Sequence, residues 1–182
     1  MKPEWSDKTV DWYAENFGDD PSVFAVVNGV SLAETDDVLD ISCGTGSALR
    51  ALREKTSGRL VGVDFIERMI DHAIRLTPVD KHIEYVVSGA EKLPFKDQEF
   101  DIVFAINAVE HWTDMKAGFA EVHRVLRPNG VFVIGGEVFE DGLIESGQKY
   151  ADKLMERGFS NVEYKTIPEG FIEIITKGHV DV

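Results

Sequence analysis

The stretch that decides the fold reads Val38-Leu39-Asp40-Ile41-Ser42-Cys43-Gly44-Thr45-Gly46. A short apolar run leads directly into a turn with two glycines, and apolar residues at helical spacing follow it. Glycine lets the backbone turn sharply and lets a ligand approach where a side chain would clash. In doubly wound sheets, the turn after the first strand borders the ligand crevice. The stretch therefore predicts both a fold class and the place of a binding site.

Strand and helix signals alternate along the rest of the chain. Short apolar runs predict strands at 38–41, 60–63, 83–87, 100–106 and 131–134. Apolar residues at helical spacing lie between them, with Gly58 as the expected stop of the first such helix and Thr113 as the expected N-cap of the last. Strands that are apolar on both faces and separated by helices are typical of a parallel sheet covered on both sides.

The alternation ends near the C-terminus. A helix is expected from Glu145 to Arg157, followed by strands at 162–167 and 171–176. The three residues between these two strands are too few for a parallel crossover, so the strands are expected to form an antiparallel hairpin. The predicted fold is α/β: a doubly wound, Rossmann-like, seven-stranded and mostly parallel sheet, with helices on both faces and a C-terminal antiparallel β-hairpin.

Two short helices are expected before the first strand. One carries aromatic residues at helical spacing, and the other begins at Asp20-Pro21, a favourable N-cap and first-turn pair. The chain shows no repeat and no linker between domains. The expected organisation is one domain over 1–182, with a helical arm at 1–34 and an α/β core at 35–182.

Composition limits the partners. With 33 acidic and 19 basic residues, the net charge is −14, which repels phosphate backbones and argues against nucleic acid. No segment approaches the about 20 consecutive apolar residues of a membrane span. The first residues lack the apolar region of a signal peptide, and the single cysteine, Cys43, suits a reducing compartment. A cytoplasmic protein without nucleic-acid or membrane partners is expected.

A second acidic position strengthens the binding-site prediction. Asp64 ends the second expected strand, eighteen residues after Gly46, where a carboxylate can accept hydrogen bonds from both ribose hydroxyls. The glycine loop alone would also fit an ordinary tight turn. Dinucleotide-binding loops carry a third glycine, but Leu49 occupies that position here. This disfavours an NAD-dependent oxidoreductase.

Five short motifs follow one another in order. They are Asp40 to Gly46, Val61-Gly62-Val63-Asp64, Ser88-Gly89-Ala90-Glu91-Lys92-Leu93-Pro94-Phe95, Phe100-Asp101-Ile102-Val103 and Leu126-Arg127-Pro128-Asn129-Gly130. Together they resemble the class I S-adenosylmethionine-dependent methyltransferases, in particular the methyltransferase type 11 group. The resemblance implies S-adenosylmethionine as cofactor, a small-molecule methyl acceptor and methyl transfer as the activity.

The resemblance also implies which residues hold the cofactor. They are Tyr13, Asp40, Ser42, Gly44, Gly46, Asp64, Phe65, Gly89, Ala90, Glu91 and Asn107. The two loop glycines would pass beside the methionine and ribose portions. Asp40 would meet the amino group, with Asn107 near the same end, and Asp64 would hold the ribose. Phe65 would lie beside the adenine, and Ala90 and Glu91 would touch its edge.

One residue departs from the family pattern, and the N-terminal arm adds a separate expectation. Ser42 stands where the family usually has glycine, so either the loop shifts or the affinity for cofactor falls. In the N-terminal arm, Tyr13 is expected to face the pocket, whereas Trp5 and Phe17 are expected to pack against the sheet edge.

The chemistry asks little of the protein beyond geometry, because the sulfonium methyl is already activated. An alcohol or ammonium acceptor would still need a base. His111, just past the fourth strand, is the candidate, because histidine exchanges protons near neutral pH; a structural histidine that caps the next helix fits equally well. No cluster with zinc-ligand spacing is present, so no metal is expected.

Two interpretations of function stay open. The connection from Val138 to Glu145 is short where many relatives insert a substrate-covering segment. This predicts an acceptor site that is open, or one completed by a second subunit in a homodimer. The alternative function is a catalytically inactive protein that binds S-adenosylmethionine and acts through a partner, which the serine at position 42 and the short connection motivate.

Overall fold

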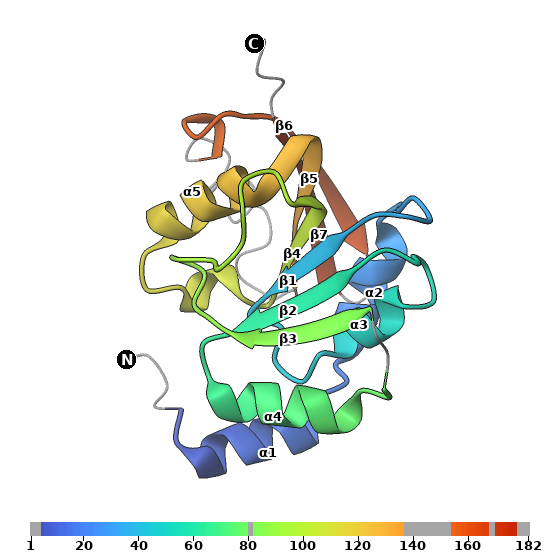
Figure 1. Ribbon diagram of the computed structural model, residues 1–182, viewed down its shortest axis with the longest axis vertical. Coiled ribbons are helices and arrows are strands. Elements are labelled where there is room, and N and C mark those ends of the chain that lie inside the picture. The colour runs from blue at the N-terminus through green and yellow to red at the C-terminus, as the bar shows by residue number, and fades with distance from the viewer. Residues whose placement is uncertain (1–4, 80–81, 137–153, 168–169, 178–182) are drawn as a thin grey trace.

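Five parallel strands form the centre of one sheet in the computed structural model, which describes residues 5–79, 82–136, 154–167 and 170–177. They are β1 (Val38–Ile41), β2 (Leu60–Asp64), β3 (Ile83–Val87), β4 (Phe100–Ile106) and β5 (Leu126–Gly136). Their order in the sheet is β3-β2-β1-β4-β5 (Figure 1). The predicted α/β, Rossmann-like parallel sheet is confirmed.

The order of the strands places the site. From β1 the chain adds β2 and β3 on one side, then crosses to add β4 and β5 on the other. β1 pairs in parallel with both β2 and β4, for example Leu39 with Val61 and with Val103. In open α/β sheets, ligands bind beyond the carboxyl ends of the strands at such a switch point. The carboxyl ends of β1, β2 and β4 are therefore the place to look for a site.

Helices cover both faces of the sheet. They are α1 (Asp7–Phe17), α2 (Pro21–Gly29), α3 (Ser47–Leu52), α4 (Glu67–Leu76), the 3-10 helix η1 (Val109–His111) and α5 (Met115–Val125). One apolar core joins α5 to the sheet through residues such as Phe119 and Phe132. A second core joins α2 and α3 to the other face through residues such as Val26 and Leu49. Burial on both sides explains why β1 and β2 are mostly apolar, apart from Asp40 and Asp64.

The helix boundaries confirm one prediction and correct two. Asp20 caps α2, because its carboxylate accepts a hydrogen bond from the Ser22 backbone N–H at 2.7 Å. The prediction of Thr113 as the cap of α5 is wrong: the Asp114 carboxylate accepts from the first turn of that helix instead. The prediction that Gly58 stops α3 is also wrong, since α3 ends at Leu52. A Cβ at Gly58 would lie 2.2 Å from the Asp36 carbonyl oxygen, so close backbone approach requires this glycine.

The last part of the sheet is antiparallel. β6 (Phe159–Ile167) and β7 (Gly170–Lys177) continue the order as β5-β7-β6, with Val131 paired to Thr176. β5 begins five residues before the predicted 131–134 strand, because Leu126 already pairs with Phe100 ahead of an irregularity in the register. The connection from Val138 to Glu145, and the predicted helix from Glu145 as far as residue 153, lie outside the described residues.

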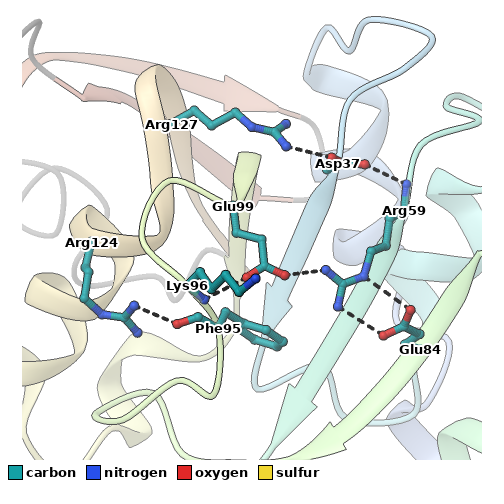
Figure 2. Close-up of polar contacts among 8 residues, drawn as sticks. All are labelled: Asp37, Arg59, Glu84, Phe95, Lys96, Glu99, Arg124 and Arg127. Carbon is teal, nitrogen blue, oxygen red and sulfur yellow. Dashed lines mark hydrogen bonds and ion pairs between the residues drawn. The ribbon is translucent and has the colours of Figure 1, made fainter.

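An ion-pair network ties the amino ends of the strands together (Figure 2). The Arg59 guanidinium donates to Glu84 at 3.1 Å and to Glu99 at 2.5 Å. Asp37 accepts from the Arg59 backbone N–H and from the Arg127 guanidinium, each at 2.9 Å. The network lies at the end of the sheet opposite the expected site, so it serves the fold.

Candidate active site

A pocket of about 350 Å³ lies at the carboxyl ends of β1, β2 and β4. Three parts of the chain line it: the N-terminal arm, the glycine loop after β1, and the segments that follow β2 and β4. The lining residues are Trp5, Thr9, Trp12, Tyr13, Ser42, Gly44, Asp64, Phe65, Ile66, Met69, Ile106, Asn107 and His111. A smaller pocket of about 110 Å³ shares three of them and is completed by Ser88, Gly89, Ala90, Glu91, Trp112 and Thr113.

The two pockets bring most of the predicted residues together. Tyr13, Ser42, Gly44, Asp64, Phe65, Asn107 and His111 line the larger pocket, and Gly89, Ala90 and Glu91 line the smaller one. Asp40 and Gly46 line neither pocket, so the structure places them behind the loop surface rather than on it.

The glycine loop has a left-handed backbone at alternate positions. The φ angles are 61° at Ser42, 52° at Gly44 and 77° at Gly46. No atom lies within 4 Å of where a Cβ of Gly44 would be, so this residue leaves open space at the pocket. A Cβ at Gly46 would lie 2.2 Å from the Tyr85 hydroxyl. Gly44 thus makes room for a ligand, whereas Gly46 makes room for Tyr85.

Asp64 joins the glycine loop to the end of β2. Its two carboxylate oxygens accept backbone hydrogen bonds from Gly44 at 3.1 Å and from Ile66 at 2.9 Å. The side chain is buried, and burial raises the pKa of its carboxyl, although these backbone hydrogen bonds act in the opposite direction. Each carboxylate oxygen can accept a second hydrogen bond, so Asp64 can still bind two hydroxyls.

Asp40 is a buried carboxyl group without a donor. It is 3% exposed, and no hydrogen-bond donor among the described residues reaches its carboxylate. Burial, with the nearby Asp64 charge, raises the pKa of Asp40 to about 8. A buried polar group without a partner is unfavourable, and a cationic ligand group would relieve that cost. The Asp40 carboxyl is therefore the group near the loop that a ligand ammonium would stabilise, if the ammonium reached it from the pocket.

Ser42 and Trp112 are joined by a side-chain hydrogen bond. The Trp112 indole N–H donates to the Ser42 hydroxyl at 3.3 Å, and the Trp112 ring is buried against Phe119. The left-handed backbone at position 42 favours glycine, which is the family residue there. The serine side chain acts here as an acceptor for the indole.

The N-terminal arm forms one wall of the larger pocket. The Trp5 ring packs edge-on against Tyr13, with centroids 5.5 Å apart, and against His111 at 6.4 Å. The prediction that Trp5 packs against the sheet edge is wrong, because its ring lines the pocket against Tyr13 and His111; the helix that follows, α1, lies along α4 (Figure 1). Phe17 packs on the rings of Trp12 and Tyr13. The spacing of Thr9, Trp12 and Tyr13 on one face of α1 was the signal that could have identified this wall.

Two predicted residues have additional tasks. The Glu91 carboxylate accepts from the backbone N–H groups of Thr113 at 2.7 Å and Asp114 at 3.1 Å, so it fixes the approach to α5. His111 lies in η1 and borders both pockets. It does not cap α5, since Asp114 does so. The prediction that His111 caps the next helix is therefore wrong, and its role as a base stays a prediction.

Two other kinds of chemistry would need a cysteine nucleophile or a metal centre in the described part of the chain. Cys43 is buried, and burial raises the pKa of its thiol well above the ordinary value, which keeps the sulfur unreactive. Within residues 5–79, 82–136, 154–167 and 170–177, no three His, Cys, Asp or Glu side chains are grouped to hold a metal ion.

Comparison with known proteins decides the family. Residues 39–134 match the family model described as a methyltransferase domain, which is more than half of the chain. The chain belongs to the methyltransferase type 11 domain family. The resemblance to class I S-adenosylmethionine-dependent methyltransferases is confirmed, and S-adenosylmethionine is the cofactor of the domain.

Relatives of this methyltransferase domain are larger. The chain is 34% identical to the sterol 24-C-methyltransferase erg6 of Schizosaccharomyces pombe, over 63% of this chain and 31% of that protein. It is 36% identical to the 2-methyl-6-phytyl-1,4-hydroquinone methyltransferase of Synechocystis, over 53% of this chain and 30% of the relative. The chain thus spans about a third of the length of these curated relatives.

A solved structure shows the same fold. Phosphoethanolamine N-methyltransferase 2 of Haemonchus contortus superposes with a TM-score of 0.77 at 16% identity, over 97% of this chain and 58% of that one. At this identity, the likeness supports the fold of the methyltransferase domain and no more.

The cofactor fits the residues of the methyltransferase domain. The Asp40 carboxyl, which no donor among the described residues reaches, matches an amino group from behind the loop surface; the buried Asp64 carboxyl matches a pair of hydroxyls, and Gly44 leaves open space at the pocket. Asn107, with φ of 51°, donates from its amide to the Ser22 hydroxyl at 3.2 Å and so links the pocket to α2. Thr9, Ile66, Met69 and Ile106 also line the pocket, and the sequence had not singled them out.

Proposed function

We propose that this chain transfers a methyl group from S-adenosylmethionine to a small-molecule acceptor with an apolar ring or chain. The observation that carries the proposal is a single pocket in which Gly44 and Asp64 form one wall and aromatic side chains form the other. Among the residues that the structure describes, no lysine or arginine lines either pocket. The described lining therefore offers an anionic acceptor no cationic side chain to offset its lost hydration. The sterol and hydroquinone named for the two relatives support an apolar acceptor.

The chain's own residues divide the work of holding the cofactor. In the proposal, Asp40 binds the amino group and Asp64 binds the ribose hydroxyls. Phe65 lies against the adenine, and the backbone of Gly89 and Ala90 borders its edge. When bound, the cofactor supplies a methyl group already activated on a sulfonium. The protein then contributes chiefly by holding the acceptor in line and excluding water.

His111 is the proposed base. It borders both pockets and packs near Trp5, so a hydroxyl or ammonium held against the arm would lie within its reach. An acceptor that loses a proton on methylation would pass it to the imidazole. An acceptor without such a proton would need only the positioning that Tyr13 and Trp5 provide.

The experiment combines binding with turnover. Calorimetry with S-adenosylhomocysteine tests the cofactor site, and mass spectrometry of mixtures with apolar alcohols, amines, thiols and carboxylates tests methyl transfer. Turnover on an apolar acceptor that falls with His111→Asn, while binding is retained, supports the proposal. Binding without turnover on any acceptor would favour the alternative of an inactive cofactor-binding protein that acts through a partner.

The proposal extends to the domain organisation, the cellular location and the oligomeric state of the protein. We propose one domain over residues 1–182, with a seven-stranded sheet that ends in the β6–β7 hairpin, in a cytoplasmic protein without nucleic-acid or membrane partners. Among the described residues, no helix combines the length and apolarity needed to cross a bilayer. An acceptor site that is open or shared between two subunits is expected. Light scattering after size exclusion, with and without S-adenosylhomocysteine, tests the dimer.

A further inference from the structure

A polar cluster joins α1 to α4 beside the pocket. The Asp11 carboxylate accepts two hydrogen bonds from the Arg68 guanidinium, from Nε at 2.7 Å and from a terminal nitrogen at 2.6 Å. His72 Nε2 lies 2.8 Å from the same carboxylate, and the Arg75 guanidinium lies 2.8 Å from His72 Nδ1. Because arginine only donates, Nδ1 accepts and Nε2–H donates to Asp11. These four residues are called the latch below.

The latch lies next to the pocket in both helices. Asp11 directly precedes Trp12, and Arg68 directly precedes Met69, and both of these neighbours line the larger pocket. Figure 1 shows α1 running alongside α4 on the outside of the molecule. The latch thus connects two walls of the pocket without contributing to its lining.

The arm has few other attachments along α1. Of residues 7–17, only Val10 is buried, while Trp12 is 56% exposed and Phe17 is 43% exposed. At its C-terminal end, the Gly18 carbonyl accepts from the Thr45 hydroxyl at 2.6 Å, which fixes that end to the glycine loop. In the middle of α1, the latch thus adds a directional polar contact to α4 beside the buried Val10.

The latch fixes the orientation of α1 relative to α4 and adds little to the global stability of the fold. A bidentate arginine–carboxylate pair holds its partners in one relative orientation. Asp11 and Arg68 remain partly exposed, and exposed ion pairs contribute little to global stability. The hydrogen bonds from Arg68 and His72 also hold the pKa of Asp11 well below its usual range, so its charge persists at neutral pH.

We propose that the latch holds α1 closed over the cofactor pocket, which makes Asp11, Arg68 and His72 positioning residues that slow cofactor release. The inference rests on the proposed function, since it concerns the same pocket. Opening the latch would swing Trp5 and Tyr13 away from the pocket while the sheet and its cores stay intact. The consequence is a faster dissociation rate with an unchanged fold.

The experiment measures release of S-adenosylhomocysteine by stopped-flow, with the fluorescence of the pocket tryptophans as signal. Asp11→Asn keeps the shape and removes the charge, and the dissociation rate is expected to rise about three- to fivefold, in the range for exposed ion pairs. Arg68→Gln should have the same effect, and the double variant should add little, because both changes break one interaction. A swapped pair, Asp11→Arg with Arg68→Asp, should recover part of the slow release.

A matched control lies at the other end of the sheet. Glu84→Gln removes the charge of a partly exposed carboxylate that pairs with Arg59, remote from the pocket. Its dissociation rate should equal that of the unaltered protein. An unchanged rate in Asp11→Asn, or an equal rise in Glu84→Gln, would overturn the proposal.

Hydrogen exchange separates failure of the latch from failure of the proposed function. In the ligand-free protein, Asp11→Asn should speed exchange across α1 and leave β4 protected. If S-adenosylhomocysteine does not bind the unaltered protein, the proposed function is refuted, and so is the proposal that the latch slows cofactor release. If the cofactor binds but α1 exchanges at the same rate in Asp11→Asn, only the latch is refuted.

Discussion

Replacing Asp40 with asparagine tests the central electrostatic feature of the site. The Asp40 carboxyl is buried, no donor among the described residues reaches it, and its pKa is raised to about 8. It is therefore mostly neutral at pH 7. If the cofactor's amino group binds beside it as a cation, the ionised carboxylate is the form that binds. Binding would then drive a proton off Asp40.

The magnitude follows from the raised pKa. Below pH 8, the ionised fraction of such a group grows about tenfold for each pH unit, which is about 1.4 kcal/mol per unit. The affinity of the unaltered protein for S-adenosylhomocysteine should therefore rise about tenfold between pH 6 and pH 7. In Asp40→Asn this rise should disappear, and the affinity at pH 7.5 should be lower.

Calorimetry in two buffers of different ionisation enthalpy measures both the affinity and the released proton. Release approaching one proton per ligand is expected at pH 6, and none through this site in the variant. An affinity that is flat between pH 6 and pH 7, or a variant with the same slope as the unaltered protein, would refute the reasoning.

Stability of the ligand-free protein gives an independent check with a definite sign. In the folded protein the pKa of Asp40 lies above its ordinary value of 3.8, so the folded state binds this proton more tightly than the unfolded state does. The resulting contribution to the free energy of unfolding is complete below pH 3.8 and is lost as the pH rises toward 8. Urea unfolding should show a smaller loss of stability over this range in Asp40→Asn.

Three further predictions concern the glycine loop and its neighbour. Asp64→Ala should weaken binding of S-adenosylhomocysteine by about ten- to hundredfold, because hydrogen bonds to a charged group are lost, and calorimetry showing unchanged affinity would contradict the ribose assignment. Gly46→Ala should destabilise the fold by about 1–3 kcal/mol in urea unfolding, since its Cβ would meet the Tyr85 hydroxyl at 2.2 Å; adding Tyr85→Phe should recover part of the loss. Ser42→Gly should be more stable than Ser42→Ala by about 1 kcal/mol, because both lose the acceptor for the indole but only alanine keeps left-handed strain at φ 61°. Equal stabilities of those two variants would show that the strain is absent.

Much of the fold was predictable because its signals are local. β1 and β2 are buried on both faces and are mostly apolar, so their runs could be recognised from composition alone; β3 is only partly buried, and its β-branched residues identified it. The glycine loop and Asp64 could be paired from sequence, because the carboxyl ends of neighbouring parallel strands meet at one edge of the sheet. Gly44 and Asp64 indeed meet through a hydrogen bond of 3.1 Å.

Other features depended on contacts between distant segments. Periodicity shows which face of α1 is apolar, but it does not show that α4, rather than the sheet, receives that helix. The expected adenine contact at Glu91 likewise carried no sign that its carboxylate binds the approach to α5.

By itself, then, the sequence determined the family, the parallel sheet and the edge of the sheet at which the glycine loop meets Asp64, since these follow from residue types at short spacing. Only the tertiary structure decided why Gly46 is glycine, where Trp5 lies and that Asp11 meets Arg68. Each of these depends on the distance between side chains far apart in the chain, and that distance is set by packing.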